Sequence, residues 1–463
     1  MVNEQLSRSL KTRHIAMISI GGIIGAGLFV GSSAAIAAAG PGIILSYLLT
    51  GVLILLVMRM LGEMAVANPG VRSFTEFARL ALGNGAGFIA GWLYYYFWVV
   101  TVPVEAIAGA KILQTWVGLP IWEIGVVLMA AMTAVNLMSA RSYGEFEFWF
   151  SSIKVAAILA FILVAAAVVL GLHPGMSRST GGEGLANLVT HGGFMPHGVA
   201  AILAGCVTVF FALTGAEITV VAAAESEEPS RAVAQLTTTL TVRIIAFYVV
   251  SIFLILCVVP WDTVKVGESP FVLALNSIGV SWAGAAMSFI VLTAVLSCLN
   301  SAFYVCSRVL FVLAEKGDAP VSLVALNARR VPTRSVWISA AAGALGVLAA
   351  TWAPATVFAF LVSASGAVIV FVYIIIAVAQ IRLRRSRDAD GVQEPPLRMW
   401  GFPWLSWVAI GAMGAILVAM ALSPSLQNDL YFSVLALVVT VGAYFVVRAR
   451  RSRARTAAPS AAS

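Results

Sequence analysis

The stretch Gly21-Gly22-Ile23-Ile24-Gly25-Ala26-Gly27 lies in the middle of an apolar run that extends from about residue 15 to residue 38. A run of this length can cross a bilayer, for which a helix needs about 20 mostly apolar residues. Four glycines in seven residues weaken the helix at this point, because each costs roughly 1 kcal/mol relative to alanine. Backbone that leaves a helix inside a membrane must find partners in protein, ligand or water. We therefore predict an interrupted helix that lines a cavity, with close helix packing through small residues as the alternative.

The composition indicates that the rest of the chain is also embedded in a membrane. Of its 463 residues, 61% are hydrophobic and 10% are charged, whereas a soluble domain carries about 25% charged residues. These values exclude disordered, collagen-like and coiled-coil classes. Twelve spans are predicted, at about residues 15–38, 43–66, 85–110, 121–139, 150–171, 198–223, 237–260, 281–306, 336–353, 357–380, 404–422 and 430–448. The predicted fold class is an all-α polytopic membrane protein.

A second interruption is predicted in the sixth span, where Thr214, Gly215 and Glu217 lie near the middle of the apolar run. The two interrupted spans are five apart, as in transporters that consist of inverted repeats around a midplane site. Residues 15–171 and 198–380 would form the two repeats, with spans 11 and 12 (residues 404–448) added after them. Free N–H groups at a broken helix attract a carboxylate, and free carbonyl groups attract an ammonium. Such a site fits a zwitterion.

The basic residues predict the orientation of the chain, whose net charge is +8. An even number of spans places both termini on one side. If that side is the cytoplasm, only Lys111, Arg178 and Lys265 lie outside and Lys154 lies within a span, as the positive-inside rule requires. We therefore predict that residues 1–14 and the basic tail 449–463 are cytoplasmic. Basic residues at the ends of apolar runs face the membrane surface and do not indicate nucleic acid binding.

Four stretches of the sequence resemble a known transporter family. They are IGGIIGAGLFVGSS (20–33), YGEFEFW (143–149), TGAEITVVAAAESEEPSR (214–231) and SCLNSAFYVCSRVLF (297–311). Together they are similar to the amino acid–polyamine–organocation (APC) superfamily, in its amino acid transporter branch. The resemblance covers about residues 10–450.

Within that branch the chain looks most like the bacterial GABA (4-aminobutyrate) permeases. The stretches GWLYYYFWVVTVPVEA (91–106) and SCLNSAFY (297–304) carry this closer resemblance. Related permeases for aromatic amino acids, lysine or proline share the remaining motifs, so the choice of substrate stays open at this point.

The resemblance implies a LeuT-type fold, a 5+5 inverted repeat with broken helices 1 and 6, and proton-coupled uptake across the bacterial cytoplasmic (inner) membrane. It implies no cofactor beyond the proton gradient, no nucleic acid and no obligatory protein partner. The substrate carboxylate is expected at Gly25, Ala26 and Gly27. The amino group is expected near backbone oxygens of Ile23, Phe211 and Thr214, with Phe211 as the aromatic gate. The complete set predicted at the substrate site is Ile23, Gly25, Ala26, Gly27, Phe211, Ala212, Thr214, Glu217, Cys298, Asn300, Ser301 and Ser365. The polar residues of the eighth span, which include Asn300 and Ser301, either line the pathway or bond across helices.

Ionisable residues at membrane depth cost about 3 kcal/mol or more, so each is a functional candidate. Lys154, in the fifth span, matches the lysine that takes the place of a sodium ion in related proton-coupled transporters, and the match implies that Lys154 carries or senses the proton. The alternative is a lysine that extends to the cytoplasmic interface. Glu105 in the third span is predicted as a proton relay, or as a carboxylate bonded by a neighbouring helix. Glu217 either stabilises the broken sixth span or contacts the substrate.

The sequence therefore predicts a proton-driven importer of a small zwitterion, with 4-aminobutyrate as the first candidate, that works by alternating access in the lipid bilayer. The alternatives are a permease for an α-amino acid, an exchanger without proton coupling, and an amino acid sensor. An enzyme would need a nucleophile with a base, or a metal cluster, and the sequence suggests neither. Carboxylates without neighbouring histidine or cysteine give little reason to expect a metal.

Overall fold

The computed structural model describes residues 12–457 except 69, 70, 72, 139, 173–183, 224–228, 280, 353, 391–394 and 425. Across this described part the chain is helical, and it contains no strand. The same residues hold nine apolar stretches that are long enough to cross a membrane, of which the first, His14–Ala67, spans 54 residues. Two shorter apolar helices cover Ile121–Asn136 and Thr333–Ala349.

The helices follow one another along the chain with short connections. They are α1 (Thr12–Ile23), η1 (Gly27–Gly31), α2 (Ser32–Ala39), η2 (Gly40–Gly42), α3 (Ile43–Ala67), α4 (Phe74–Leu82), α5 (Asn84–Val117), α6 (Ile121–Asn136), α7 (Ala140–Val169), η3 (Gly184–Ala186), α8 (Asn187–Thr190), α9 (Gly198–Leu213), α10 (Ile218–Ala223), α11 (Pro229–Val258), η4 (Trp261–Thr263), α12 (Pro270–Ser277), α13 (Ser281–Glu315), η5 (Val321–Val324), α14 (Thr333–Ala349), α15 (Pro354–Ala389), α16 (Trp404–Leu422) and α17 (Gln427–Ala457).

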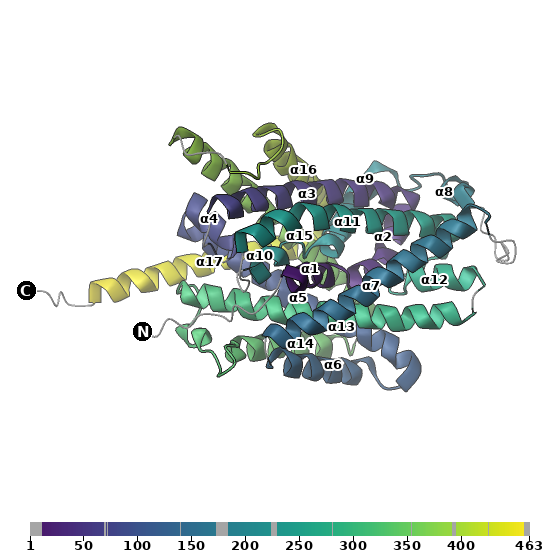
Figure 1. Cartoon of the computed structure of the whole chain (residues 1–463), viewed down its shortest axis with the longest axis horizontal. Helices are drawn as coiled ribbons and strands as arrows, with labels where there is room; N and C mark the ends of the chain where they lie inside the picture. The colour runs from purple at the N-terminus through teal and green to yellow at the C-terminus, as the bar shows by residue number, and fades with distance from the viewer. Residues whose placement is uncertain are drawn as a thin grey trace, which may run out of the picture.

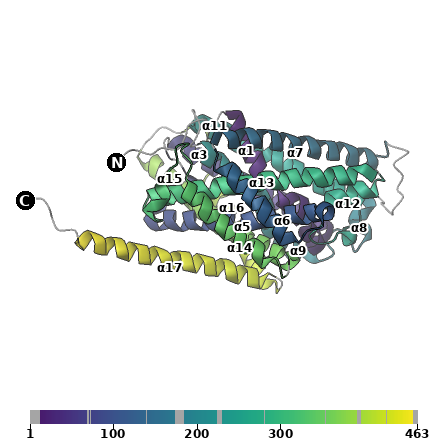
Figure 2. The ribbon, with the colours of Figure 1, turned by 90° about the horizontal axis from the view of Figure 1, so that it is seen from below.

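The long helices lie side by side in one bundle (Figure 1). Helix α4 and the C-terminal end of α17 lie at one end of the bundle, and α8 and α12 lie at the other. Helix α17 runs along the edge of the bundle (Figure 2), and only 11% of its most apolar stretch is buried inside the protein. In α13, 83% of the corresponding stretch is buried, so this helix belongs to the centre of the bundle.

The first interruption separates α1 from η1. Helix α1 ends at Ile23, the chain leaves the helical path at Ile24 and Gly25, and it continues as the π-helical turn η1. A side chain at Gly25 would lie 2.6 Å from both the Cβ atom of Cys298 and an oxygen of Glu105. Because neither neighbour leaves space, this position requires glycine.

The second interruption separates α9 from α10. Residues 214–217 form a turn in which Thr214 is extended and Gly215 has a φ of +128°, which favours glycine. A side chain at Gly215 would also lie 2.9 Å from the carbonyl oxygen of Gly22. The two interruptions predicted from the glycines are therefore present and lie against each other.

Several helices are longer than the spans predicted from the sequence. The predicted spans 150–171, 237–260, 281–306, 357–380 and 430–448 lie within or overlap α7, α11, α13, α15 and α17. Apolar residues mark the part of a helix that is in the membrane, whereas charged residues such as arginine, lysine and glutamate are good helix formers and extend it. The short helices α4 and α12 were not predicted, because neither is long enough to give a spanning signal.

Candidate functional site

The two interrupted helices approach each other closely at Gly27 and Ala212. A Cβ atom at Gly27 would lie 2.7 Å from the Cα atom of Ala212. Both residues are buried in the centre of the bundle. The predicted site residues Gly25, Gly27 and Ala212, which are far apart in the sequence, thus meet in one place.

Tyr248 on α11 connects the ends of the two broken helices. Its hydroxyl lies 2.8 Å from the carbonyl oxygen of Ile23 and 3.0 Å from that of Ala212. The hydroxyl has one proton and therefore donates to one of these oxygens at a time. The carbonyl of Ile23, which was predicted to face the substrate amino group, thus has a donor from the protein within reach.

Glu105 binds the backbone of the first interruption directly. Its two carboxylate oxygens accept the N–H group of Ala26, at 3.1 and 3.0 Å. The side chain is 1% exposed. Ala26 precedes the second half of the broken helix, where an anion is stabilised by free N–H groups and by the helix dipole. The backbone predicted to hold the substrate carboxylate therefore holds a carboxylate of the protein in this structure.

Lys154 on α7 binds the other side of the same interruption. Its ammonium donates hydrogen bonds of 2.8 Å to the carbonyl oxygens of Gly21 and Ile24. The side chain is 0% exposed, so it does not extend to the membrane interface. A cation at the C-terminal end of a helix is favourable. The first interruption is thus held between a carboxylate and an ammonium.

Glu217 is bonded by three donors. The hydroxyl of Tyr94 lies 3.2 Å from one carboxylate oxygen, and the hydroxyl of Tyr373 and the N–H of Gly215 lie 3.0 Å from the other. Tyr94 belongs to α5 and Tyr373 to α15. Of the two roles predicted for Glu217, this geometry favours stabilisation of the second interruption.

Cys298 of α13 contacts the first interruption. Its sulfur lies 3.4 Å from the carbonyl oxygen of Gly22, and its Cβ atom restricts the space at Gly25. All four cysteines are free and buried.

Two other predicted residues of α13 bond to neighbouring helices. The amide oxygen of Asn300 accepts a hydrogen bond of 2.7 Å from Asn136 of α6. The hydroxyl of Ser301 lies 3.0 Å from that of Tyr143 of α7, which donates to it. The sequence left open whether these polar groups line a pathway or bond across helices, and the structure shows bonds across helices.

Glu147 is a buried carboxylate that the sequence analysis did not identify as a candidate. It accepts hydrogen bonds of 2.6 Å from Ser297 and 3.1 Å from Asn300. Its side chain is 0% exposed and leaves no room for a side chain at Gly21. The prediction placed the start of the fifth span at residue 150, so Glu147 lay outside the predicted span. The aromatic residues around it, in YGEFEFW, are the signal that the helix begins earlier.

A comparison with protein families gives a match over most of the chain. A family model described as amino acid permease matches residues 14–458. The chain belongs to the amino acid permease family. This membership confirms the predicted relation to the APC superfamily, and it is a family of transporters.

Several relatives of this permease are similar along almost their full length. The gamma-aminobutyric acid permease of Bacillus subtilis is 42% identical over 454 residues, which cover 98% of this chain and 96% of the relative. The gamma-aminobutyric acid permease of Escherichia coli is 44% identical over 92% of this chain and 91% of its own length. A probable GABA permease of Pseudomonas aeruginosa is 44% identical over 95% of this chain and 92% of its own length.

The permease also resembles a solved structure. A manganese transporter mutant of Eremococcus coleocola superposes with a TM-score of 0.60 over 96% of this chain and 94% of its own, at 13% sequence identity. At this identity the similarity concerns the fold alone. It supports the predicted all-α transporter fold of the LeuT type.

Three of the residues predicted at the substrate site make their contacts with other side chains or backbone groups of the protein. The hydroxyl of Thr214 donates to the carbonyl of Phe210 at 2.6 Å, and that of Ser365 donates to Leu361 at 2.5 Å. Both donors are therefore used within or next to their own helices. Phe211, the predicted gate, is 5% exposed, and its ring centroid lies 5.9 Å from that of Phe97.

In the described residues, no group of three or more histidine, cysteine or acidic side chains is arranged to hold a metal.

Replacement of Glu217 by glutamine should destabilise the permease. The new amide group would face at least one of the three donors, and a buried donor without an acceptor costs about 1–3 kcal/mol. We expect a lower thermal unfolding midpoint in detergent and reduced uptake. Tyr373→Phe is the matched control, because it removes one donor and leaves the carboxylate, and should give a smaller decrease. An unchanged midpoint for Glu217→Gln would contradict this role.

Proposed function

We propose that this permease imports a small zwitterionic amino acid, 4-aminobutyrate, together with protons. Three relatives named as GABA permeases or a probable GABA permease are 42–44% identical to it, each across more than nine tenths of both chains. The observation that carries the proposal is the first interruption, whose backbone binds a carboxylate on one side and an ammonium on the other. Such a backbone has the groups needed for both ends of a zwitterion.

The proposed architecture has twelve spans in a 5+5 inverted repeat with two added helices. Helices α1 with α2, α3, α5, α6 and α7 would form the first repeat, and α9 with α10, α11, α13, α14 and α15 the second. Helices α16 and α17 follow. The interrupted helix is the first member of each set, which supports the division into residues 15–171 and 198–380.

Both termini are proposed to lie in the cytoplasm. Arginine residues of α4, α15 and α17 take part in ion pairs, and the C-terminal end of α17 lies at the same end of the bundle as α4 (Figure 1). There, Asp318 binds both Arg79 and Arg451, the latter at 2.8 Å. Glu63 binds Arg384 and Arg387 at 3.3 Å each. An excess of basic residues at one end of a membrane protein marks the cytoplasmic side.

Proton coupling is proposed to operate through competition for the N–H group of Ala26. A charged carboxylate is a stronger acceptor than a neutral carboxylic acid. When Glu105 takes up a proton, its hold on Ala26 weakens and the substrate carboxylate can replace it. The proton and the substrate would then be bound together, which is the requirement for symport.

Lys154 is proposed to keep the first interruption open while this exchange takes place. Its bonds to Gly21 and Ile24 fix the carbonyl side of the break. The substrate amino group would reach the oxygens of Ile23 and Ala212 that Tyr248 contacts. Alternating access would then move the two repeats around this point.

A permease for an α-amino acid is the second candidate. The aromatic amino acid transport protein of Escherichia coli is 35% identical over 94% of each chain. The backbone groups at the interruptions would serve either substrate, because both carry a carboxylate and an ammonium.

Uptake of labelled 4-aminobutyrate into proteoliposomes tests the proposal. With an imposed gradient that is acidic outside, we expect accumulation that a proton ionophore abolishes. Unlabelled ω-amino acids should compete, and α-amino acids should not. Competition by one α-amino acid would instead support the second candidate. Uptake that does not depend on the proton gradient would indicate an exchanger, and binding without uptake would indicate a sensor.

A further inference from the structure

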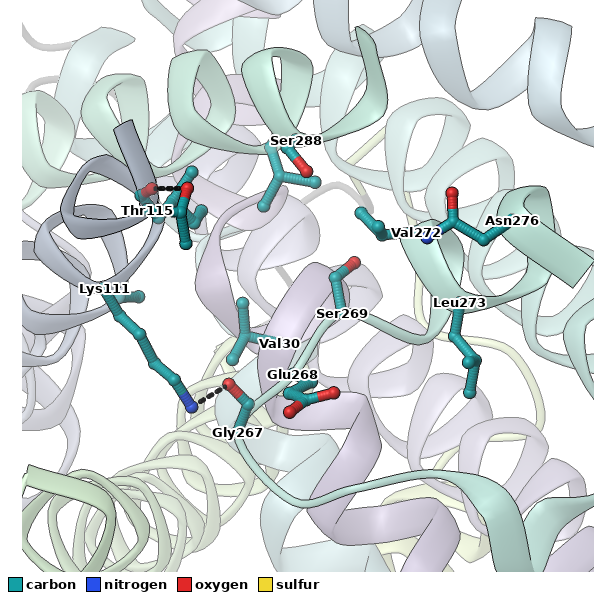
Figure 3. Close-up of a pocket in the computed structure, with 13 residues that line it drawn as sticks. Val30, Lys111, Thr115, Gly267, Glu268, Ser269, Val272, Leu273, Asn276 and Ser288 are labelled. Atoms are coloured by element: carbon teal, nitrogen blue, oxygen red, sulfur yellow. Dashed lines mark hydrogen bonds between the residues drawn. The ribbon is translucent and has the colours of Figure 1, made fainter. Parts of the chain in front are cut away.

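A cavity lies at the end of the bundle opposite α4. It has a volume of about 320 Å³ and is lined by residues of η1, α5, α12 and α13 and by Gly267, Glu268 and Ser269 of the segment before α12 (Figure 3). We refer to it as the outer pocket. Its volume is within the range of about 300–1,000 Å³ that is typical of small-molecule sites.

The outer pocket lies in line with the first interruption. Ala108, which lines the pocket, is three residues after Glu105 on α5. Val30, on the other wall, is four residues after Ala26. Residues three or four apart share one face of a helix. The pocket is therefore about one helical turn beyond the contact between Glu105 and Ala26, on the same helix faces.

Two groups of opposite charge line the pocket. Lys111 donates a hydrogen bond of 2.7 Å to the carbonyl oxygen of Gly267. Both Lys111 and Glu268 are exposed at the mouth of the pocket, and no ion pair or hydrogen bond joins the carboxylate of Glu268 to a residue that the structure describes. In Figure 3 Glu268 lies between Lys111 on one side and Leu273 of α12 on the other. An ammonium and a carboxylate that do not pair with each other are complementary to a zwitterion.

Ser269 adds a neutral polar group to the pocket. Its hydroxyl oxygen is buried, and among the described residues it has no hydrogen-bond partner. A buried hydroxyl without a partner costs free energy, and a ligand that bonds to it removes this cost. Together with the two charges, it gives the pocket three polar groups that a small ligand can use.

We propose that the outer pocket is a second binding site for the zwitterionic substrate, occupied before the substrate reaches the two interruptions. The substrate carboxylate binds Lys111 and the hydroxyl of Ser269, and its ammonium binds Glu268. This assignment rests on the proposed function for the class of ligand and on the cavity for the place.

Binding at this site also acts on the segment that covers the pocket. Gly267 is held from two sides, because its N–H donates to the hydroxyl of Ser33 at 2.9 Å and its carbonyl accepts from Lys111. A substrate carboxylate that takes the ammonium of Lys111 competes with the second of these bonds. The substrate thereby loosens the connection between α5 and the segment before α12.

Charge-removing variants test the site by transport kinetics. We expect Lys111→Met and Glu268→Gln each to raise the KM for 4-aminobutyrate by about tenfold with little change in the maximal rate, because hydrogen bonds to charged groups are the stronger ones. Lys265→Met is the matched control, since Lys265 is exposed in the same connection and does not line the pocket. A KM that stays at the wild-type value in both variants overturns the proposal.

A thiol-labelling experiment tests the site without transport. Ser269→Cys is labelled with a water-soluble thiol reagent, and the wild-type chain, whose four cysteines are buried, provides the blank. We expect 4-aminobutyrate to slow the labelling, and to do so equally when Gly27→Val removes the site at the interruptions. Protection that disappears in the double variant overturns the proposal, because it would then originate at the interruptions.

The two proposals fail in different ways. If the uptake panel identifies an α-amino acid as the substrate, that amino acid replaces 4-aminobutyrate as the probe in both experiments. If transport of 4-aminobutyrate is found but neither KM nor labelling responds, the outer site is refuted and the proposed function stands.

Discussion

Lys154→Ala is expected to abolish proton-driven accumulation of the substrate and to leave part of the exchange between labelled and unlabelled substrate. Without the ammonium, the carbonyl oxygens of Gly21 and Ile24 lose their donor in a buried place. Hydrogen bonds to charged groups contribute about 1.5–3 kcal/mol. Their loss lets the first interruption move away from the geometry that links proton and substrate binding. Both processes are measured in the same proteoliposomes, with and without an imposed gradient.

Lys265→Ala is the control for this variant, because it removes an exposed lysine from a connection outside the site. It should keep both accumulation and exchange. If Lys154→Ala loses both to the same extent, the lysine is needed for the structure of the interruption and not specifically for coupling. If accumulation is retained, Lys154 has no part in coupling.

The two interruptions could be predicted because two features of the sequence favour different structures there. A long apolar run in a membrane favours a continuous helix, whereas the cluster of glycines around Gly25 destabilises a helix. Where local preference and the requirements of the fold disagree, a functional or strained site is expected. The same argument applies to Gly215, whose positive φ is found in the structure.

The partners of these interruptions could not be predicted. Tyr94, Tyr248 and Tyr373 come from three helices that are far apart in the sequence, and each lies in an apolar stretch where an aromatic residue usually belongs to the core. Only the packing of the bundle shows that their hydroxyl groups converge on the two breaks. No spacing within one helix contains this information.

For the eighth predicted span, the sequence identified polar residues near the site but not the direction in which each side chain points. Cys298, Asn300 and Ser301 were predicted at the site because they are polar residues of SCLNSAFY, a stretch that carries the resemblance to the GABA permeases. Cys298 and Asn300 are two residues apart, which on a helix turns their side chains about 200° apart, so these two cannot face one cavity. In the structure Cys298 contacts the first interruption, whereas Asn300 and Ser301 bond to α6 and α7.

Gly27→Ala is expected to cause the other large loss, that of substrate binding. The new methyl group would lie 2.7 Å from the Cα atom of Ala212, which is backbone and cannot turn aside. Overpacking of this kind costs about 1–3 kcal/mol, and a cost of this size in binding corresponds to a decrease of roughly 5- to 150-fold in affinity. Equilibrium binding of labelled 4-aminobutyrate to the purified permease measures the effect, and Gly27→Val should enlarge it.

Gly31→Ala is the matched control, because it adds the same methyl group to the same buried turn η1. There the nearest atom would lie at 3.5 Å, which is ordinary van der Waals contact. We expect Gly31→Ala to bind substrate like the wild type, and both variants to elute as folded protein. Equal loss of binding in the two variants would mean that any change in η1 disturbs the permease. Normal binding in Gly27→Ala would show that the contact between the two broken helices is not part of the substrate site.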